Sequence, residues 1–176
     1  MDINSIKKQD LFEKNTILMV VYGISAYLGG IAQFFLDRPI GIALSLFIPA
    51  TINLGYFIAQ RYIEALRPYF PFFAIMMSVI MVYGTIISFK VTLATIVLSV
   101  FILILSSIHN HYAVLVVGYI GSVIGMTFNF VLDTGNFAVD PANVYVTLTL
   151  MAVALYLMVR QNKKLITQVE QLMTLA

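Results

Sequence analysis

The segment VRQNKKLITQVEQLMTLA, residues 159–176, starts in an apolar run and continues as a polar stretch with helical spacing. Residues at intervals of three and four share one face, at the a and d positions of a heptad repeat. These residues are Asn162, Leu165, Val169, Leu172 and Ala176. No glycine, proline or turn cluster separates them from the preceding apolar run, so we expect one continuous helix. Such a helix can carry a displacement from a membrane to the segment that follows.

The composition sets the class of protein. Of the 176 residues, 61% are hydrophobic and 10% are charged, whereas a soluble domain carries about 25% charged residues. This polar surface is too small to cover a water-soluble globule, so we expect the solvent to be lipid. Cysteine is absent, which excludes disulfides, thiolate catalysis and thiolate metal sites. The first apolar run is too long for a signal-peptide core and lacks an Ala-x-Ala-like site, so it should remain as an anchor.

Six apolar runs approach or exceed the roughly 20 residues that a helix needs to cross a hydrocarbon core of ~30 Å. They are residues 16–36, 40–59, 69–89, 91–108, 112–132 and 144–159. The boundary between the third and fourth runs is weak, because Lys90 is the only charged residue in 72–108. As a single helix that stretch would measure about 55 Å, so we expect it to turn back at Lys90.

The distribution of basic residues gives the orientation. With six spans and a cytoplasmic N-terminus, only Arg38 and Lys90 of the ten Lys and Arg residues lie outside, as the positive-inside rule requires. We therefore predict an all-α integral membrane protein, a six-helix transmembrane bundle with a C-terminal cytoplasmic helix. Its parts are a cytoplasmic arm (1–15), a six-span domain (16–159) and an exit helix (160–176). It should be a multi-pass protein of the plasma membrane with both termini in the cytoplasm. The arm is either a short interfacial helix or a solvated segment.

The interior of the spans carries polar but uncharged residues. No charged residue lies well inside a span, which argues against an ion-coupled transporter or a charge-lined channel but leaves a carrier for a neutral solute open. The candidates for a small ligand pocket are Gln33, Asn53, Ser88 and Asn129. The alternative is that these side chains hydrogen-bond neighbouring helices. Small residues four apart, such as Ala26 with Gly30 and Gly121 with Gly125, indicate close helix packing in the bundle or a dimer face.

Catalytic and metal-binding motifs are missing from the sequence. His109 and His111 would point about 200° apart on a helix, and no cysteine or carboxylate accompanies them, so we expect no metal site. They more simply cap an inner loop, where imidazoles can also sense pH. Phosphate loops, serine elbows and dinucleotide fingerprints are absent, so we expect neither an enzyme nor a cofactor. The basic residues are dispersed and the formal charge is +2, so nucleic acid is not an expected partner.

Asn162 is the most informative residue of the exit segment. A buried Asn at an a position can fix the register of a parallel two-stranded coiled coil. Alternatively, residues 160–164 form a polar collar in which Asn162 is solvated. The apolar stripe also contains Ile166 and Met173, and this width would also suit a helical bundle or an amphipathic helix in the membrane plane.

Two edges of the chain carry a family resemblance. VRQNKKL (159–165) with QVEQL (168–172) resembles the exit from membrane to cytoplasm in multi-span methyl-accepting chemotaxis proteins of Gram-positive bacteria. IKKQDLF (6–12), followed by Lys14 and Asn15, is similar to the start of such chains. The family continues into a long cytoplasmic hairpin with methylation sites and a tip that contacts a kinase and its adaptor. None of that hairpin lies within residues 1–176. Any sensor with a helical exit, including histidine kinases, shares these features.

The expected function is signal input by a membrane-embedded sensor of a chemotaxis-type transducer. The bundle would bias the exit helix in a homodimer and act on a downstream cytoplasmic signalling domain, or on a kinase and its adaptor. We expect Asn162, Leu165, Val169 and Leu172 to transmit the signal. The alternative is a small-solute-binding or permease subunit, such as the six-helix substrate-capture component of energy-coupling vitamin transporters. A purely structural membrane scaffold is a third possibility.

Overall fold

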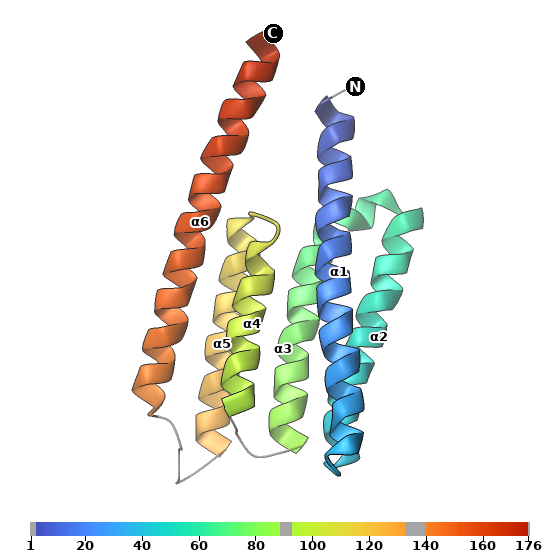
Figure 1. Ribbon diagram of the computed structural model, residues 1–176, viewed down its shortest axis with the longest axis vertical. Helices are drawn as coiled ribbons and strands as arrows, with labels where there is room; N and C mark the ends of the chain where they lie inside the picture. Colours follow the sequence, from blue (N-terminus) through green and yellow to red (C-terminus); the bar gives the residue numbers. More distant parts are fainter. Residues whose placement is uncertain (1–2, 89–92, 133–139, 176) are drawn as a thin grey trace.

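The computed structural model describes residues 3–88, 93–132 and 140–175, and the elements in these ranges are helical. They are α1 (Ile3–Phe35), α2 (Ile40–Tyr62), the short 3₁₀ helix η1 (Glu64–Tyr69), α3 (Phe70–Ser88), α4 (Leu93–Ser107), α5 (Tyr112–Leu132) and α6 (Pro141–Leu175). The long helices lie side by side along one direction (Figure 1). The prediction of an all-α fold is confirmed for the part of the chain that the structure describes.

Five of the described helical segments are long and apolar enough to cross a membrane. They are Ser5–Phe35, Ile40–Tyr62, Glu64–Thr85, Tyr112–Val131 and Pro141–Val169. The apolar part of α4, Ile96–Ser107, is shorter. The run 72–108 is divided into α3 and α4, which pack against each other. Lys90, the predicted turn, lies outside the described residues. The fold is therefore compatible with a membrane protein.

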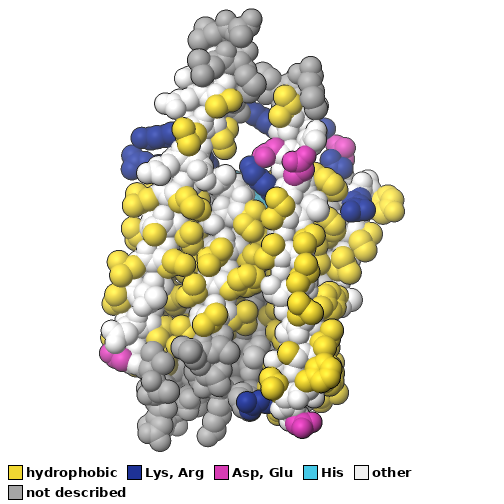
Figure 2. Space-filling view, viewed as in Figure 1, with side chains coloured by type: hydrophobic (Ala, Val, Ile, Leu, Met, Phe, Trp, Pro, Cys, Tyr) yellow, Lys and Arg dark blue, Asp and Glu magenta, His cyan; other side chains and the backbone are white. Residues whose placement is uncertain are grey.

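The surface of the bundle supports a lipid environment. Hydrophobic side chains cover the middle of the face in Figure 2, and charged side chains lie towards its two ends. On α1 the residues Val20, Ile24, Leu28 and Ile31 are each about half exposed, at the spacing of one helical face. Soluble monomers rarely expose apolar patches of this extent, whereas lipid tails solvate them at no cost.

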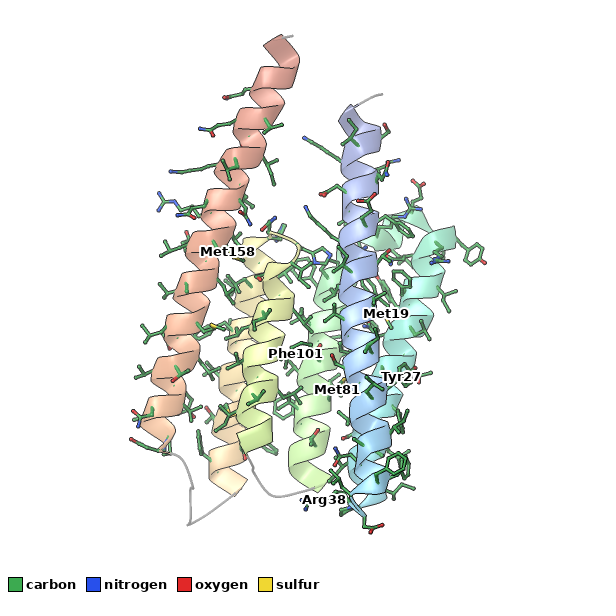
Figure 3. The ribbon with its side chains drawn as sticks, viewed as in Figure 1. Met19, Tyr27, Arg38, Met81, Phe101 and Met158 are labelled. Atoms are coloured by element: carbon green, nitrogen blue, oxygen red, sulfur yellow. The ribbon has the colours of Figure 1, made fainter. Side chains whose placement is uncertain are left out.

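Two clusters of buried side chains hold the helices together. The larger one is centred on α1, α2 and α3, includes Met19 and Met81, and has Phe101 of α4 packed against it (Figure 3). Buried residues of α4 and α5, among them Ile102 and Val114, extend it towards the other helices. The smaller one joins α4, α5 and α6 through Leu103, Met126, Val144 and Leu148. Helix α3 links the two parts because it contacts both α4 and α5. The molecule is thus built from an α1–α3 half and an α4–α6 half.

Glycines permit the close helix contacts inside the bundle. A Cβ atom at Gly84 of α3 would lie 2.6 Å from the Cβ of Ser45 in α2. A Cβ atom at Gly121 of α5 would lie 2.5 Å from Val79 of α3, and one at Gly30 would lie 2.5 Å from the ring of Phe47. Since Gly30 and Gly121 from the predicted small-residue pairs closely approach neighbouring helices, the structure supports bundle packing for them rather than a dimer face.

Helix boundaries differ from the predicted ones at two connections. Helix α6 begins at Pro141, three residues before the expected start, because proline is favoured at the first helical position and the Asp140 carboxylate accepts a hydrogen bond from the Ala142 amide at 3.0 Å. The predicted separator 60–68 contains the last turn of α2 and most of η1. Sequence periodicity revealed neither the start of α6 at Pro141 nor the short helix η1.

Both chain termini lie at the same end of the molecule, here called the termini end (Figure 1). Helices α1 and α6 have 33 and 35 residues, or about 50 Å each, and both project beyond the other helices at this end. Helix α1 passes residue 15 and α6 passes residues 159–160 without a break. Arg38 marks the opposite end (Figure 3).

Candidate functional site

A buried polar network at the termini end is centred on Asn15, which is fully buried. Its Nδ2 atom donates to Gln60 Oε1 at 2.7 Å and to the Arg67 carbonyl oxygen at 3.0 Å. Its Oδ1 atom lies 2.7 Å from His109 Nε2. A carbonyl oxygen can only accept, so Arg67 fixes the orientation of the Asn15 amide. Oδ1 must then accept from His109, whose Nε2 carries the hydrogen.

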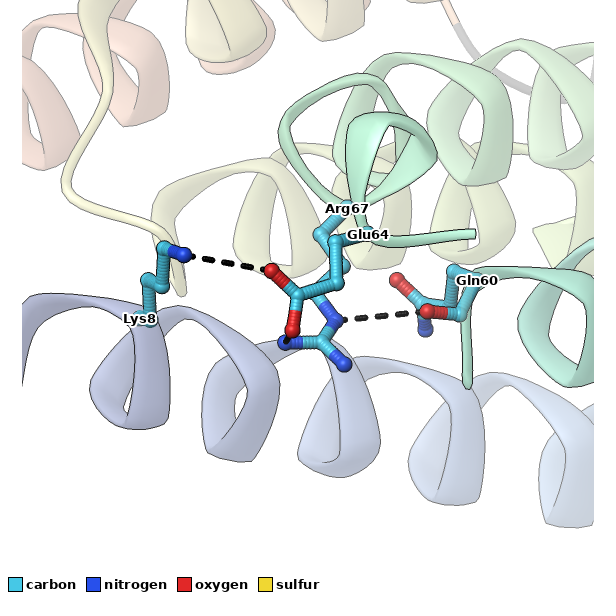
Figure 4. A network of polar contacts seen from close by, with 4 residues as sticks. All are labelled: Lys8, Gln60, Glu64 and Arg67. Atoms are coloured by element: carbon cyan, nitrogen blue, oxygen red, sulfur yellow. Dashed lines mark hydrogen bonds and ion pairs between the residues drawn. The ribbon is translucent and has the colours of Figure 1, made fainter. Parts of the chain in front are cut away.

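Four different elements supply this network. Asn15 belongs to α1, Gln60 to the last turn of α2, Arg67 to η1, and His109 to the connection between α4 and α5. The Arg67 Nε atom also donates to the Gln60 carbonyl oxygen at 3.2 Å (Figure 4). The hydrogen bonds of the Asn15 side chain therefore join segments that are 45 to 94 residues apart in sequence.

A layer of ion pairs covers the network towards solvent. Glu64 pairs with Lys8 at 3.1 Å and with Arg67 at 3.4 Å (Figure 4). The Glu64 and Lys8 side chains are 59% and 67% exposed, and exposed pairs contribute little to stability because water screens them. Leaving a buried amide group without its partner costs about 1–3 kcal/mol. The buried amides, rather than the ion pairs, therefore hold these elements in place.

His109 is held in its neutral form. Its pKa is lowered to about 4, first by burial and then by the nearby Lys14 ammonium, against an opposing effect of the Asp10 carboxylate. The Nδ1 atom is buried and has no hydrogen-bond partner among the residues that the structure describes. Protonation would place a second N–H at this position without an acceptor, which agrees with the low pKa.

The connection between α4 and α5 contacts three helices through three consecutive residues, here called the 109–111 loop. His109 bonds to Asn15 of α1. Asn110 accepts a hydrogen bond at its Oδ1 from Asn162 Nδ2 of α6, at 3.1 Å. His111 lies edge-on to Phe72 of α3, with ring centroids 5.8 Å apart. Asn110 has φ 51°, a left-handed conformation that Asn tolerates better than most residues. The loop thus bridges the two halves where α6 leaves the bundle.

The predicted transmission residues lie on the projecting part of α6. Asn162 is bonded to Asn110 of its own chain and is only partly buried. Leu165 and Val169 are 59% and 53% exposed, so nothing in the described part of the chain covers this stripe. Leu172 lies in α6, but its side chain is outside the described set.

The predicted pocket residues are dispersed along the bundle. Gln33 donates to the Gly29 carbonyl oxygen of its own helix at 3.2 Å. Asn53 is buried with its Nδ2 atom 3.7 Å from the Met19 sulfur, and Met19 lies about 21 Å from Gln33 along α1. The structure therefore does not bring Gln33 and Asn53 together.

The other two pocket candidates give less information. Asn129 is buried in α5, with its Nδ2 atom 4.0 Å from the Met126 sulfur of the α4–α6 half. Ser88 is the last residue of α3, and its side chain is not among those described. The Oδ1 atom of Asn53 has no hydrogen-bond partner in the described ranges.

Sequence reasoning missed the network around Asn15. Asn15 and Gln60 lie at the ends of apolar runs, where polar residues are expected to face solvent. The predicted topology does place residues 15, 60–67 and 109 on one side of the membrane. That shared location was the only available signal, because hydropathy does not reveal which ends pack together.

Two open grooves occur at the termini end. The first, of about 650 Å³, is lined by Ser5, Lys8, Gln9, Phe12, Arg61, Glu64 and Arg67. The second, of about 460 Å³, lies beside α6 and is lined by Tyr112, Arg160, Lys163, Lys164, Thr167 and Gln168. Within the described ranges, no group of three or more His, Cys, Asp or Glu residues is placed to hold a metal ion.

Comparisons with family models, with curated proteins and with solved structures found no match for this chain. The arrangement at the termini end is therefore the basis for a functional proposal.

Proposed function

We propose that the chain is a membrane-embedded signal-input module of a chemotaxis-type transducer, with six spans and both termini in the cytoplasm. The bundle responds to a ligand or to the state of the membrane, and α6 passes the response to a downstream signalling domain, or to a kinase and its adaptor. The observation that carries the proposal is the 109–111 loop, which bonds α1 through His109 and α6 through Asn110. A change in packing in the α1–α3 half thereby has a direct route to α6.

The attachment of α6 is weak enough to be shifted. Beyond the small apolar cluster, α6 is attached by exposed hydrogen bonds of Thr149 with Tyr119 and of Tyr145 with Thr127, and by the Asn110–Asn162 bond. The Tyr112 ring of α5 adds contacts with Lys163 and Tyr156. Each such hydrogen bond contributes about 1 kcal/mol net. A stimulus that favours one of two packings by about 5.5 kcal/mol moves the equilibrium from 1:99 to 99:1.

Asn162 has two alternative partners in this mechanism. In one state it donates to Asn110 and holds α6 against its own bundle. In the other state it enters the seam between two α6 helices, where an Asn at an a position sets the register. The exposed side chains of Leu165 and Val169 supply the apolar contacts of this homodimer.

The lack of cysteine allows a direct test. Single cysteines placed one at a time at positions 165–176 are oxidised in native membranes, and dimers are counted on a gel. We expect maxima at positions 165, 169, 172 and 176, the pattern of a parallel helix pair. A flat profile would rule out the paired helix and favour a solute-binding or permease subunit, which should bind a small molecule and tolerate removal of residues 165–176.

A further inference from the structure

The groove beside α6 carries an excess of positive charge. Arg160, Lys163 and Lys164 line it together with neutral residues, and none of its described lining residues is acidic. Lys163 is held in place because its ammonium nitrogen lies 4.1 Å from the centroid of the Tyr112 ring. Figure 2 shows Lys and Arg side chains gathered on this part of α6, just beyond its hydrophobic surface.

The groove beside α1 provides an internal comparison. It also has three cationic residues, but Glu64 lies among them and pairs with both Lys8 and Arg67. One of its three positive charges is therefore balanced within the protein. The groove beside α6 has no comparable carboxylate among its described residues, so all three of its positive charges are available to attract an external anion.

The position of the groove identifies the source of that anion. The lipid-facing surface of α6 reaches Leu157 and Met158, which are 48% and 41% exposed, and Arg160 follows after the buried Val159. Lys164 lies six residues beyond Met158, or about 9 Å along the helix, which is the depth of lipid headgroups. The rings of Tyr112 and Tyr156 pack here at a tilt of 39° with centroids 5.1 Å apart, and tyrosines are enriched at membrane interfaces.

We propose that this groove binds the headgroup phosphate of an anionic phospholipid. Arg160, Lys163 and Lys164 neutralise the phosphate, and the Gln168 amide provides a further donor. The acyl chains lie against the exposed apolar face of α6. Basic pockets between membrane helices bind anionic headgroups by this combination of charge and depth. The proposal is independent of dimer formation and of any signalling role.

The test uses the full chain with Tyr156→Trp as a reporter. The chain has no other tryptophan, and Tyr156 is next to the groove without lining it. The protein is reconstituted in phosphatidylcholine vesicles that contain either brominated phosphatidylglycerol or the same fraction of brominated phosphatidylcholine. Bromine quenches tryptophan at short range. We expect stronger quenching by the anionic lipid, with a relative affinity of about fivefold or more, since each basic residue near the surface attracts anionic lipid with about 1 kcal/mol.

A matched pair of variants separates this site from general attraction. Arg160→Gln with Lys164→Gln leaves the Lys163–Tyr112 contact intact and should bring the relative affinity close to one. Lys7→Gln with Arg61→Gln removes the same amount of positive charge elsewhere at the termini end. This double variant should keep the relative affinity of the parent protein for the anionic lipid. Tryptophan emission before quenching checks that each variant is folded.

Three results would overturn the proposal. The first is equal quenching by the two lipids in the parent protein. The second is an equal loss of the preference for anionic lipid in both double variants. The third is displacement of the anionic lipid by millimolar inorganic phosphate. The last result would assign the groove to a soluble anion instead.

Discussion

Asn15 shows how one side chain joins distant parts of the chain. Its amide donates two hydrogen bonds and accepts one, and the partners belong to the end of α2, to η1 and to the 109–111 loop. A polar residue at the end of an apolar run would ordinarily be assigned to solvent. Here it is fully buried because three other segments close over it.

Replacement of Asn15 by alanine should therefore be costly. Asn15→Ala leaves Gln60 Oε1 and the His109 N–H group buried without their partners, and we expect a loss of about 2–4 kcal/mol in the free energy of unfolding. Denaturant titration in detergent micelles measures this loss. Asn143→Ala, at an exposed asparagine near the start of α6, should change stability by less than about 0.5 kcal/mol. Similar effects of the two substitutions would contradict the role given to the network.

His109 gives the molecule a defined pH dependence. Its folded-state pKa of about 4 lies below the ordinary value of 6.5, so between these values the unfolded chain binds a proton that the folded chain does not. Stability should fall as the pH decreases through this window, by at most about 1.4 kcal/mol per pH unit. Above 6.5 this contribution is constant.

The pH effect is measured as the thermal unfolding midpoint at about pH 7 and about pH 5. His109→Gln should reduce the difference between the two midpoints, because glutamine does not titrate. Its neutral side chain can still donate a hydrogen bond to Asn15, so the network is retained. His111→Gln is the matched control and should keep the difference. A parent protein that is equally stable at both pH values would refute the buried neutral state of His109.

At the scale of single elements, apolar length was a reliable guide. The expected run 112–132 coincides with α5, and α2 begins at the expected residue 40. These helices are specified by long apolar runs, and α2 continues through Pro49. The start of α6 and the helix η1 were not predicted, because they depend on a local cap at Asp140 and on packing against α1, neither of which gives a hydropathy signal.

The contact between α2 and α3 depends on the small size of Gly84. Gly84→Ala brings a methyl group within 2.6 Å of the Ser45 Cβ, so the helices must separate, and we expect a loss of about 1–3 kcal/mol. Gly55→Ala is a suitable control because no atom lies within 4 Å of its added Cβ. It should leave stability unchanged or raise it by up to about 1 kcal/mol. Unfolding in mixed micelles compares the two, and equal effects would show that the close approach is not important.

On the scale of the whole molecule, the class of fold was predictable but the site was not. Composition and run lengths were sufficient for a helical fold whose apolar helices are compatible with a membrane protein. The contacts of His109 with Asn15 and of Asn110 with Asn162 join segments 94 and 52 residues apart, and a single sequence has no feature that pairs them. Asn162 was expected either in a dimer seam or in solvent, and its bond to Asn110 was not foreseen.

We propose that the 109–111 loop restrains α6 through Asn162. We would measure the rate of disulfide formation by Val169→Cys in native membranes, with and without Asn110→Ala, and with Asn143→Ala as the matched control. Removal of one hydrogen bond of about 1 kcal/mol should release Asn162 and raise the rate of dimer formation about fivefold, while the control leaves it unchanged. An unchanged or slower rate in the Asn110→Ala protein would contradict the claim that this loop restrains α6.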